Sequence, residues 1–420
     1  MVITVSVAAL VLGACSAKKS SSGSPAQGTA GASSTAGGSS SSSAAPSSST
    51  PAPEPAALTV SAKSGATDVS PITPITVDVA HGELGSVTLH NAEGLAVKGA
   101  LSADKTKWTS SEALGYGKTY KLTAQATGSD GKAVTKTSSF TTVVPDNQTM
   151  AYITTAAGQA FQAGQKQGVG QVVKIHFDEA ITDKKAAQDA VSVTTSPGQV
   201  GGFSWLSDQD LYWRTKAYLK TGTKVSIQTH IYGKNFGSAT ASLYGQADAA
   251  AAFTVGARQI SIADDNTKVI NVYQNNKLIK TIPTSMGRHT SIAGDTGPID
   301  LRTNSGPHVV IGGETNINMN SASFGLSKGA NAYKTIVPVG VKISYDGEYV
   351  HWADWSVWAQ GNTDTSHGCL NVSPDNSWWF YHFSQPGDIV DVKNTGRTLD
   401  EWNSGYWNVT WAKWMAGSAK

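Results

Sequence analysis

The chain has 420 residues, which is enough for about three domains of ordinary size. Its 32 basic and 30 acidic residues leave a net charge of only +2, so no nucleic-acid partner is expected. Charged residues make up 15% of the chain while glycine contributes 43 residues, a balance that favours turn-rich β structure and excludes helical bundles. The 2 cysteines, Cys15 and Cys369, are too few for a disulfide framework or a zinc site built on paired cysteines.

The N-terminus carries the pattern of an export signal. Residues 1–14 form an apolar and small-residue run that is too short to span a membrane but suits a signal-peptide core. The run ends in Leu12-Gly13-Ala14-Cys15, which resembles a bacterial lipobox, where the cysteine is lipidated and becomes the new N-terminus. We therefore expect a signal and lipobox over 1–15, and a protein held by lipid alone on the outer face of the cytoplasmic membrane. The alternative is a buried N-terminal strand.

A tether is predicted after this signal. Residues 16–57 are almost entirely Ser, Ala, Gly, Thr and Pro. A segment of this composition buries too little apolar surface to fold, so a disordered linker is expected between Cys15 and the first domain.

Two similar β-rich regions follow, over residues 58–145 and 146–256. Each consists of short β-type segments separated by turn residues. Trp108 and Leu122 of the first region recur in register as Trp213 and Ile227 of the second. The pattern predicts two tandem immunoglobulin-like β-sandwiches, a label that rests on analogy and assigns them no role beyond spacing.

The third region, residues 257–393, has a different sequence pattern. It opens with three β-type segments and later contains a stretch rich in Gly, Asn and Ser, residues 302–334, which is predicted to be a functional loop or lid. Near its end Ser373 and Pro374 predict the N-cap and first position of one short helix, followed by a last strand.

The remaining residues, 394–420, form a Trp-rich tail. It contains Trp402, Trp407, Trp411 and Trp414. Because so many exposed indoles would promote aggregation, this tail is expected to pack on the preceding domain.

Cys369 is the candidate reactive group. If Cys15 is lipidated, Cys369 is the only free thiol, in the context Thr365-Ser366-His367-Gly368-Cys369-Leu370-Asn371. Gly368 permits backbone angles that let successive amides converge beside the sulfur as an oxyanion hole. A thiol is mostly protonated at pH 7, so a nucleophilic cysteine needs a histidine to take its proton.

Two histidines compete for that role. On an extended strand His367 would lie roughly 6 to 7 Å from the cysteine, too far for a direct hydrogen bond. His351 follows a strand, turn, strand pattern and can approach from a neighbouring element. We assign His351 as the base and His367 as a local orienting group.

The segment from His351 through Ser366-His367-Gly368-Cys369-Leu370-Asn371 resembles the signature of the YkuD-type L,D-transpeptidases. The order of two immunoglobulin-like domains, a catalytic domain over 257–393 and a Trp-rich tail is similar to actinobacterial lipoprotein members. The resemblance implies a mainly β fold with Cys369 as nucleophile and His351 as general base. It also implies an oxyanion hole of backbone amides at Gly368 and Cys369, with Ser366 and Asn371 as supporting hydrogen-bonders.

The resemblance further implies substrate-binding positions. Tyr333, Met319 and Phe324 match lid and pocket positions along the donor path, although all three would also suit ordinary packing. Trp352 follows the base, and in the family the backbone carbonyl at that position orients the imidazole. A common Thr-Pro-x-Gly segment appears here as Thr296-Gly297-Pro298-Ile299-Asp300, which changes that edge of the pocket.

The function that the resemblance implies is formation of 3-to-3 peptidoglycan crosslinks. Peptidoglycan stem peptides are the expected donor and acceptor, D-alanine is released, and carbapenem-type β-lactams are expected covalent inhibitors. No cofactor and no metal site is expected. Two alternatives stay open: a cysteine-dependent cell-wall peptide hydrolase, although hydrolases of the NlpC/P60 kind place the cysteine before the histidine, and a non-catalytic wall-binding lipoprotein.

Overall fold

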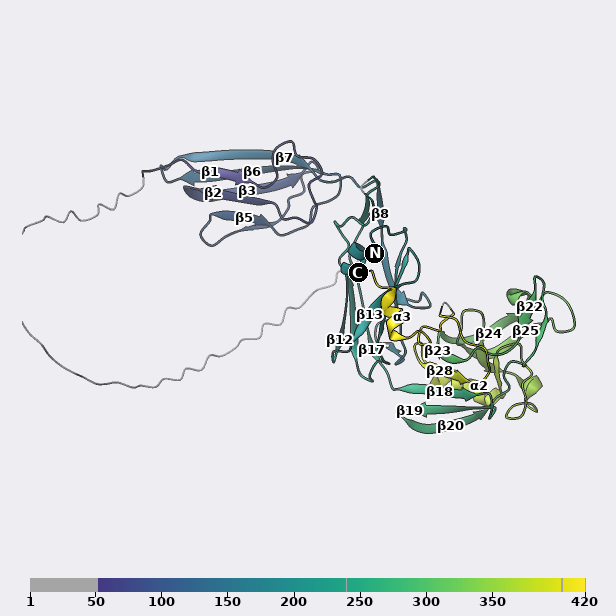
Figure 1. Cartoon of the computed structure of the whole chain (residues 1–420). Coiled ribbons are helices and arrows are strands. Elements are labelled where there is room, and N and C mark those ends of the chain that lie inside the picture. The colour runs from purple at the N-terminus through teal and green to yellow at the C-terminus, as the bar shows by residue number, and fades with distance from the viewer. Residues whose placement is uncertain (1–51, 239, 402, 420) are drawn as a thin grey trace, which may run out of the picture. The chain divides into compact units, whose positions relative to one another are not determined.

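The computed structural model describes residues 52–238, 240–401 and 403–419, and Figure 1 shows their strands and helices. The expected signal, the lipidation site at Cys15 and most of the 16–57 tether lie outside the described residues. The described part is built mainly from β-strands. Within it, no helix combines the length and the apolar character that crossing a bilayer requires.

The first sandwich packs a four-stranded sheet on a three-stranded one. The four-stranded sheet has the order β1-β2-β5-β4, and the other β3-β6-β7. Their bounds are β1 Ala57–Val60, β2 Thr76–Ala80, β3 Gly82–Asn91, β4 Gly99–Leu101, β5 Lys107–Ser110, β6 Thr119–Gly128 and β7 Ala133–Thr141. Alternate residues of β6 are buried, as expected for a strand with one face on a core.

The second sandwich has two four-stranded sheets, ordered β10-β17-β15-β12 and β13-β14-β11-β9. The bounds of these strands are β9 Ala151–Thr155, β10 Lys166–Gln167, β11 Val173–Phe177, β12 Val191–Ser196, β13 Gly201–Trp205, β14 Asp210–Thr215, β15 Lys224–Thr229 and β17 Ala249–Val255. The short helix α1 (Lys184–Asp189) connects β11 to β12, and β8 (Asn147–Thr149) pairs in parallel with β16 (Leu243–Gly245).

The tryptophans that recur in the sequence occupy equivalent buried positions in the two sandwiches. Trp108 on β5 and Trp213 on β14 are both 4% exposed, each in the core of its own sandwich. Each indole lies over a glycine of the neighbouring strand. A Cβ atom on Gly99 would come within 2.1 Å of the Trp108 ring, and one on Gly201 within 2.3 Å of the Trp213 ring. The predicted pair of immunoglobulin-like sandwiches is confirmed.

The third domain contains two larger sheets and one small hairpin. The five-stranded sheet has the order β20-β19-β18-β28-β23, and the four-stranded sheet the order β24-β25-β26-β27. The bounds are β18 Gln259–Asp264, β19 Val269–Gln274, β20 Lys277–Pro283, β21 Ser291–Ala293, β22 Pro298–Asp300, β23 Gly306–Val309, β24 Gly312–Asn320, β25 Lys334–Lys342, β26 Tyr349–Trp352, β27 Leu370–Val372 and β28 Ile389–Lys393. A shared core of buried aliphatic side chains lies between the two sheets and helix α2.

Helix α2 (Pro374–Phe383) is the helix that the sequence predicts after the nucleophile. The Ser373 hydroxyl accepts a hydrogen bond from the Asn376 amide, and Pro374 occupies the first turn. A second helix, α3 (Trp411–Ala416), was not predicted and lies in the tail, capped by Thr410.

The stretch predicted as a lid is shorter than expected. Residues 312–320 form strand β24, which pairs along its length with β25, so that the loop proper covers 321–333 and begins with a 3-10 turn, Ser321–Phe324. Most side chains of β24 are exposed and Ile317 is its one buried residue. A polar strand of this kind has no apolar alternation, because pairing with β25 rather than burial specifies it.

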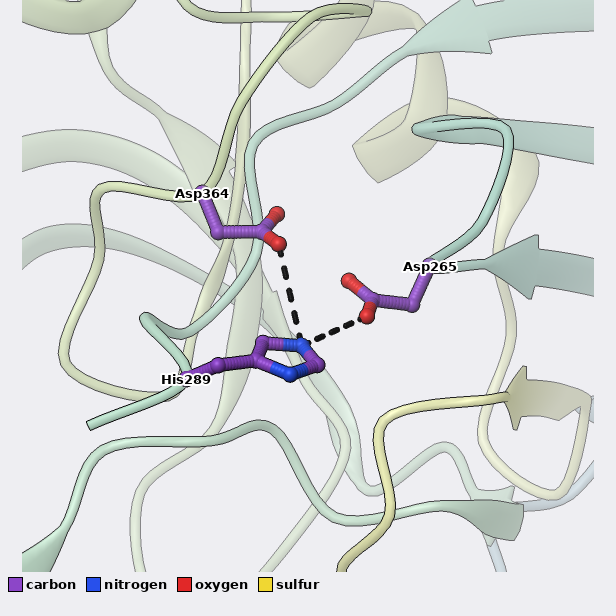
Figure 2. A group of neighbouring side chains, drawn as sticks. All are labelled: Asp265, His289 and Asp364. Carbon is purple, nitrogen blue, oxygen red and sulfur yellow. Dashed lines mark hydrogen bonds and ion pairs between the residues drawn. The ribbon is translucent and has the colours of Figure 1, made fainter. Parts of the chain in front are cut away.

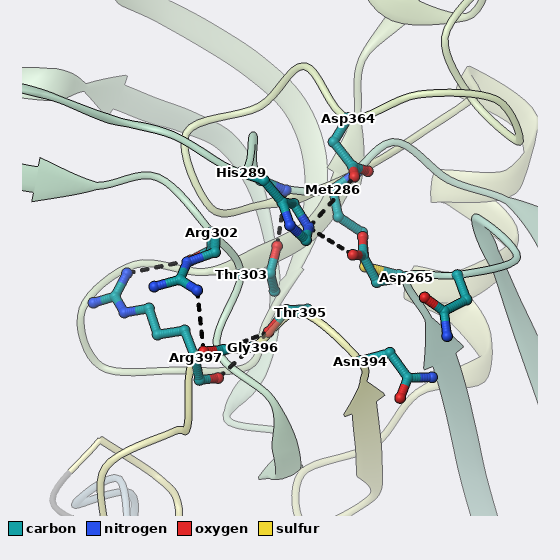
Figure 3. Close-up of polar contacts among 12 residues, drawn as sticks. Asp265, Met286, His289, Arg302, Thr303, Asp364, Asn394, Thr395, Gly396 and Arg397 are labelled. Atoms are coloured by element: carbon teal, nitrogen blue, oxygen red, sulfur yellow. Dashed lines mark hydrogen bonds and ion pairs between the residues drawn. The ribbon is translucent and has the colours of Figure 1, made fainter.

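The tail begins on the third domain. Arg397 donates from Nη1 to the Arg302 carbonyl at 3.2 Å, and Arg302 donates from its own Nη1 to the Gly396 carbonyl at 3.1 Å, so the two loops hold each other reciprocally (Figure 3). Further along, the Ser404 hydroxyl donates to the Ile343 carbonyl at 2.6 Å. This half of the tail lies where the sequence analysis placed it.

The end of the tail contacts the second sandwich instead. Trp407 and Trp414 donate from their indole nitrogens to the carbonyls of Gly170 and Gly202, each at 2.9 Å. The guanidinium of Arg214, a residue only 2% exposed, lies 4.6 to 5.5 Å from the rings of Trp407, Trp411 and Trp414. The expectation that the whole tail packs on the catalytic domain is therefore corrected, because a buried cation on β14 provides a better partner for these indoles.

Candidate active site

Strands β26 and β27 carry the candidate residues on one face of their sheet. The two strands are parallel, with His351 in register with Asn371 and Val350 with Leu370. Val350 and Leu370 point into the core under α2. Because side chains alternate along a strand, His351 and Asn371 occupy the opposite face, together with Cys369 directly before β27.

His351 is held as a neutral base. Its Nδ1 lies 2.6 Å from the Trp352 carbonyl oxygen, which can only accept, so Nδ1 carries the proton and Nε2 is free to take another. The residue is 3% exposed, and this burial lowers the pKa of His351 to about 4, although the bonds to the Trp352 backbone and the Asn371 side chain act in the opposite direction. The carbonyl contact is the one that the resemblance implied for Trp352.

Cys369 is a half-buried, protonated thiol. Burial raises the pKa of Cys369 to about 12, a hydrogen bond from the Tyr349 backbone lowers it, and the charges of Glu348 and Asp346 raise it further. Its Sγ lies 3.6 Å from the Gly347 carbonyl oxygen. Within the part of the chain that the structure describes, no hydrogen bond joins the thiol to His351, so the resting pair is a neutral thiol beside a neutral imidazole.

A tight turn presents Cys369. The Ser366 hydroxyl donates to the Cys369 carbonyl at 2.6 Å and accepts from the Gly368 amide at 3.1 Å. Gly368 has φ +135°, which favours glycine, and its carbonyl accepts from the Thr303 hydroxyl at 2.8 Å. The Gly368 amide is therefore engaged, whereas the Cys369 amide has no partner among the described residues. Of the two amides expected in the oxyanion hole, only that of Cys369 is free.

His367 belongs to the wall of the site rather than to the proton path. Its Nε2 accepts from Arg288 at 3.0 Å, and Arg288 also contacts the Asn331 side chain of the lid loop at 3.3 Å. The ring centroid lies 5.1 Å from that of Tyr333. Burial and the Arg288 charge lower the pKa of His367, so the ring is uncharged at neutral pH. His367 thus orients the lid, not the sulfur.

A cavity of about 750 Å³ lies over Cys369. Its wall includes Cys369 and Gly368 together with the predicted pocket residues His367, Tyr333, Met319 and Phe324. The other predicted site residues, which are His351, Trp352, Ser366 and Asn371, lie behind the wall and do not line it. Direct contact of Trp352 with substrate is therefore not supported, since its contribution to the site is a backbone carbonyl.

The lid loop is fastened from the small hairpin. Asp295, in the turn between β21 and β22, accepts from the Ser327 amide at 3.0 Å and from its hydroxyl at 2.8 Å, and its own amide donates to the Gly325 carbonyl at 2.7 Å. The segment that departs from the family's Thr-Pro-x-Gly pattern, residues 296–300, runs from this turn into β22. The residues of β22, Pro298, Ile299 and Asp300, line one edge of the cavity.

Sequence reasoning missed a buried contact between a histidine and a glutamate beside Cys369. His308, with no exposed side-chain surface, contacts Glu348 Oε2 at 3.0 Å and the Gly306 carbonyl at 2.8 Å. Asn304 donates to Glu348 Oε1 from its amide at 2.8 Å. Glu348 is thus held by contacts from both His308 and Asn304. His308 and Glu348 lie 40 residues apart, so no local pattern could reveal their contact.

A second polar cluster braces the approach to the catalytic turn. His289 lies 2.6 Å from Asp265 and 3.8 Å from Asp364, and the ligand-type atoms of all three lie within 4.8 Å of one another (Figure 2). The ammonium of Lys268 contacts both carboxylates. The cluster thus has its own cation, and the expectation of no metal site stays a prediction. Asp364 also accepts from the Met286 amide at 3.0 Å, which fixes the segment before Ser366.

Two protein-family profiles match this chain. The profile of YkuD, described as the L,D-transpeptidase catalytic domain, matches residues 258–392, and that of Big_10, a bacterial Ig domain, matches residues 66–235. L,D-transpeptidase 2 of Mycobacterium tuberculosis (strain CDC 1551 / Oshkosh) is 40% identical over 366 residues, which cover 86% of this chain and 85% of that protein. L,D-transpeptidase 5 of M. tuberculosis (strain ATCC 25618 / H37Rv) is 35% identical, with 88% of this chain and 78% of that protein covered.

One solved structure can be set beside these relatives. The crystal structure of L,D-transpeptidase 3 from M. tuberculosis in complex with a faropenem-derived adduct is 23% identical to this chain. The alignment covers 57% of this chain and 98% of the other, with a TM-score of 0.44.

Proposed function

This chain belongs to the L,D-transpeptidase family, and we propose that it forms 3-to-3 peptidoglycan crosslinks through a thioester on Cys369. The observation that carries the residue assignment is the parallel pair β26 and β27, which puts the half-buried thiol and the buried, correctly protonated imidazole on one face of a sheet under a substrate-sized cavity. The bond attacked joins the third residue of a tetrapeptide stem to its terminal D-alanine.

In the first half-reaction the thiol proton moves to His351 Nε2 as the sulfur attacks the carbonyl carbon. The proton must move during the attack, because both groups are neutral at rest. The Trp352 carbonyl stabilises the imidazolium that forms, since it already accepts from Nδ1. The proton then passes to the leaving amine, D-alanine departs and the thioester remains.

The sulfur must turn toward the imidazole for this step. At rest it contacts the Gly347 carbonyl, and His351 lies two residues beyond Tyr349 along β26. Catalytic hydrogen bonds are often long before substrate binds and tighten in the complex. Rotation about the Cα–Cβ bond of Cys369 would exchange the carbonyl contact for the imidazole, while Ser366 keeps the backbone of the turn in place.

The free amide of Cys369 is the primary donor to the developing oxyanion. The Gly368 amide can join it only if it leaves the Ser366 hydroxyl, at 3.1 Å in the resting structure. A preorganised donor directed at developing charge contributes a large part of the barrier reduction in acyl transfer. Ser366 therefore both shapes the turn and controls the second donor.

The experiment for this function is a crosslinking assay on purified tetrapeptide stems. Cys369→Ala should abolish both D-alanine release and dimer formation, because it removes the sulfur that must form the thioester. His351→Gln should bind stems but release D-alanine about 100- to 10,000-fold more slowly. Undiminished turnover by Cys369→Ala would refute the assignment.

Carbapenem-type β-lactams should acylate the same sulfur. The strained lactam carbonyl needs only a nucleophile in a cavity of sufficient size, and Cys369 lines a space of about 750 Å³. Intact-protein mass spectrometry should show one adduct, mapped to Cys369. A protein that stays unmodified by excess carbapenem would contradict this part of the proposal.

Membrane attachment through Cys15 is proposed on the motif Leu12-Gly13-Ala14-Cys15 and on the composition of residues 16–57. A lipidated Cys15 would place the enzyme on the outer face of the cytoplasmic membrane, with the tether carrying it toward the wall. Expression in a bacterial host should yield a membrane-bound protein that a detergent releases. Cys15→Ser should abolish incorporation of labelled fatty acid and leave Cys369 chemistry intact.

A further inference from the structure

The turn Tyr345–Glu348 brings two carboxylates beside the nucleophile. Asp346, Gly347 and Glu348 all line the cavity with Cys369, and the Gly347 carbonyl lies 3.6 Å from the sulfur. Glu348 contacts the buried imidazole of His308 at 3.0 Å. Among the described residues, Asp346 makes no contact of this kind.

Asp346 is exposed to the cavity and is held only by neutral donors. Its carboxylate accepts from the Ser344 hydroxyl and from the Asn304 side-chain amide. Among the residues that the structure describes, no lysine, arginine or histidine forms an ion pair with it, whereas Glu348 on the same turn contacts His308. A rigid carboxylate is thus presented to whatever enters the cavity.

This carboxylate opposes the first half-reaction. A negative charge near a thiol disfavours the thiolate, and Asp346 and Glu348 both raise the pKa of Cys369. Formation of the acyl-enzyme therefore gains nothing from Asp346. The second half-reaction is different, because the attacking group is a primary amine that reaches the site as an ammonium ion at neutral pH.

From this geometry we infer that Asp346 and the Gly347 carbonyl form the subsite for the ammonium group of the acceptor. The inference rests on the proposed function and specifies its acceptor as a stem whose third residue carries a cationic side-chain amine. The carboxylate supplies the opposite charge and the carbonyl accepts an N–H bond, next to the thioester that the amine must attack.

The chemistry balances without a further reactant. The bound ammonium gives one proton to solvent, the amine forms a C–N bond to the thioester carbon, and the C–S bond breaks. The second amine proton passes through His351 Nε2 to the departing sulfur. The products are the crosslink amide and the free thiol, so the enzyme returns to its resting protonation state.

The turn is fixed well enough to act as a subsite. The Asp346 amide donates to the Asn403 side chain of the tail at 2.9 Å, and the Glu348 amide donates to the Ser344 hydroxyl at 2.9 Å. Asn304 contacts both carboxylates. Held from the tail on one side and from the buried contact of His308 with Glu348 on the other, the carboxylate is oriented before the acceptor arrives.

The test uses the full chain with a tetrapeptide donor and two competing nucleophiles. One is a diamino-acid stem, cationic at pH 7.5, and the other is hydroxylamine, which is uncharged there. Asp346→Asn keeps the shape of the side chain and removes its charge. Asp354→Asn, an exposed aspartate outside the cavity wall, is the control for net charge.

The ratio of crosslink to hydroxamate should fall about fivefold in Asp346→Asn, a size typical of one exposed ion pair. It should not change in Asp354→Asn, and high salt should lower the wild-type ratio toward that of the variant. The ratio does not depend on how much enzyme is folded. An unchanged ratio with normal D-alanine release would refute the subsite alone, whereas absence of D-alanine release from the wild type would overturn the proposed function as well.

Discussion

Alkylation of Cys369 by iodoacetamide should be slow at neutral pH and should accelerate steadily as the pH rises. Only the thiolate reacts, and burial together with two nearby carboxylates raises the pKa of Cys369 to about 12. An ordinary thiol of pKa about 8.5 is roughly 3% ionised at pH 7, and a thiol of pKa 12 roughly 0.001%. The loss of thiolate is therefore about three and a half orders of magnitude.

The observed rate should fall by less than this. A more basic thiolate is also a better nucleophile, with a Brønsted slope of about 0.4 to 0.5. This greater nucleophilicity increases the alkylation rate by about one and a half orders of magnitude. The net expectation is a rate about 100-fold below that of free cysteine at pH 7. The logarithm of the rate should rise with a slope near one through pH 9.

Peptide mapping after timed alkylation measures the extent of modification of Cys369 separately from that of Cys15. Asp346→Asn should react faster than the wild type, because one of the charges that disfavour the thiolate is gone. A pH-independent rate between pH 6 and 9 would refute the reasoning, since it would show a preformed thiolate and imidazolium at rest. A rate equal to that of free cysteine would refute the effect of burial.

Three further predictions concern residues near Cys369, and a fourth concerns the packing of the tail on the second sandwich. Since burial lowers the pKa of His351 to about 4, the neutral base persists in mild acid, and D-alanine release should hold its rate down to about pH 5; a loss of rate centred near pH 6.5 would contradict this. Ser366→Ala should lower kcat/KM about 10- to 100-fold through loss of two hydrogen bonds, and Ser366→Thr should recover most of it. Trp352→Phe should keep kcat within about twofold, because the backbone carbonyl holds His351; a loss comparable to His351→Gln would assign the side chain a role. Arg214→Ala should lower the free energy of unfolding by about 3 kcal/mol in urea titrations, while the exposed Lys216→Ala should not; equal stabilities would show that the indoles do not depend on the cation.

Local sequence signals predicted the local features of this protein. Ser373 and Pro374 mark the start of α2 because a cap and a fixed φ act within one turn of the chain. The paired tryptophans, Trp108 and Trp213, identified the two sandwiches because each must be buried against a glycine on the next strand. The spacing of His351 and Cys369 predicts that both lie near one sheet, and the parallel pair β26 and β27 places His351 in register with Asn371, two residues beyond Cys369.

Features that depend on distant partners could not be predicted. Strand β24 has no apolar alternation, and only its pairing with β25 specifies it. The contact of His308 with Glu348 forms only when β23 of one sheet and the turn before β26 of the other are brought together. The end of the tail packs on the second sandwich because Arg214 is buried there. The composition of the tail alone could not predict this partner.

The most direct test of the account is to trap the acyl-enzyme. The wild-type protein is mixed with a tetrapeptide stem that lacks a free side-chain amine, so that no acceptor is present, and its intact mass is followed. A gain equal to the stem without its D-alanine, located on Cys369 by peptide mapping and absent from Cys369→Ala, is the predicted result. An adduct on another residue, or D-alanine release with no covalent species from a protein lacking this sulfur, would contradict it.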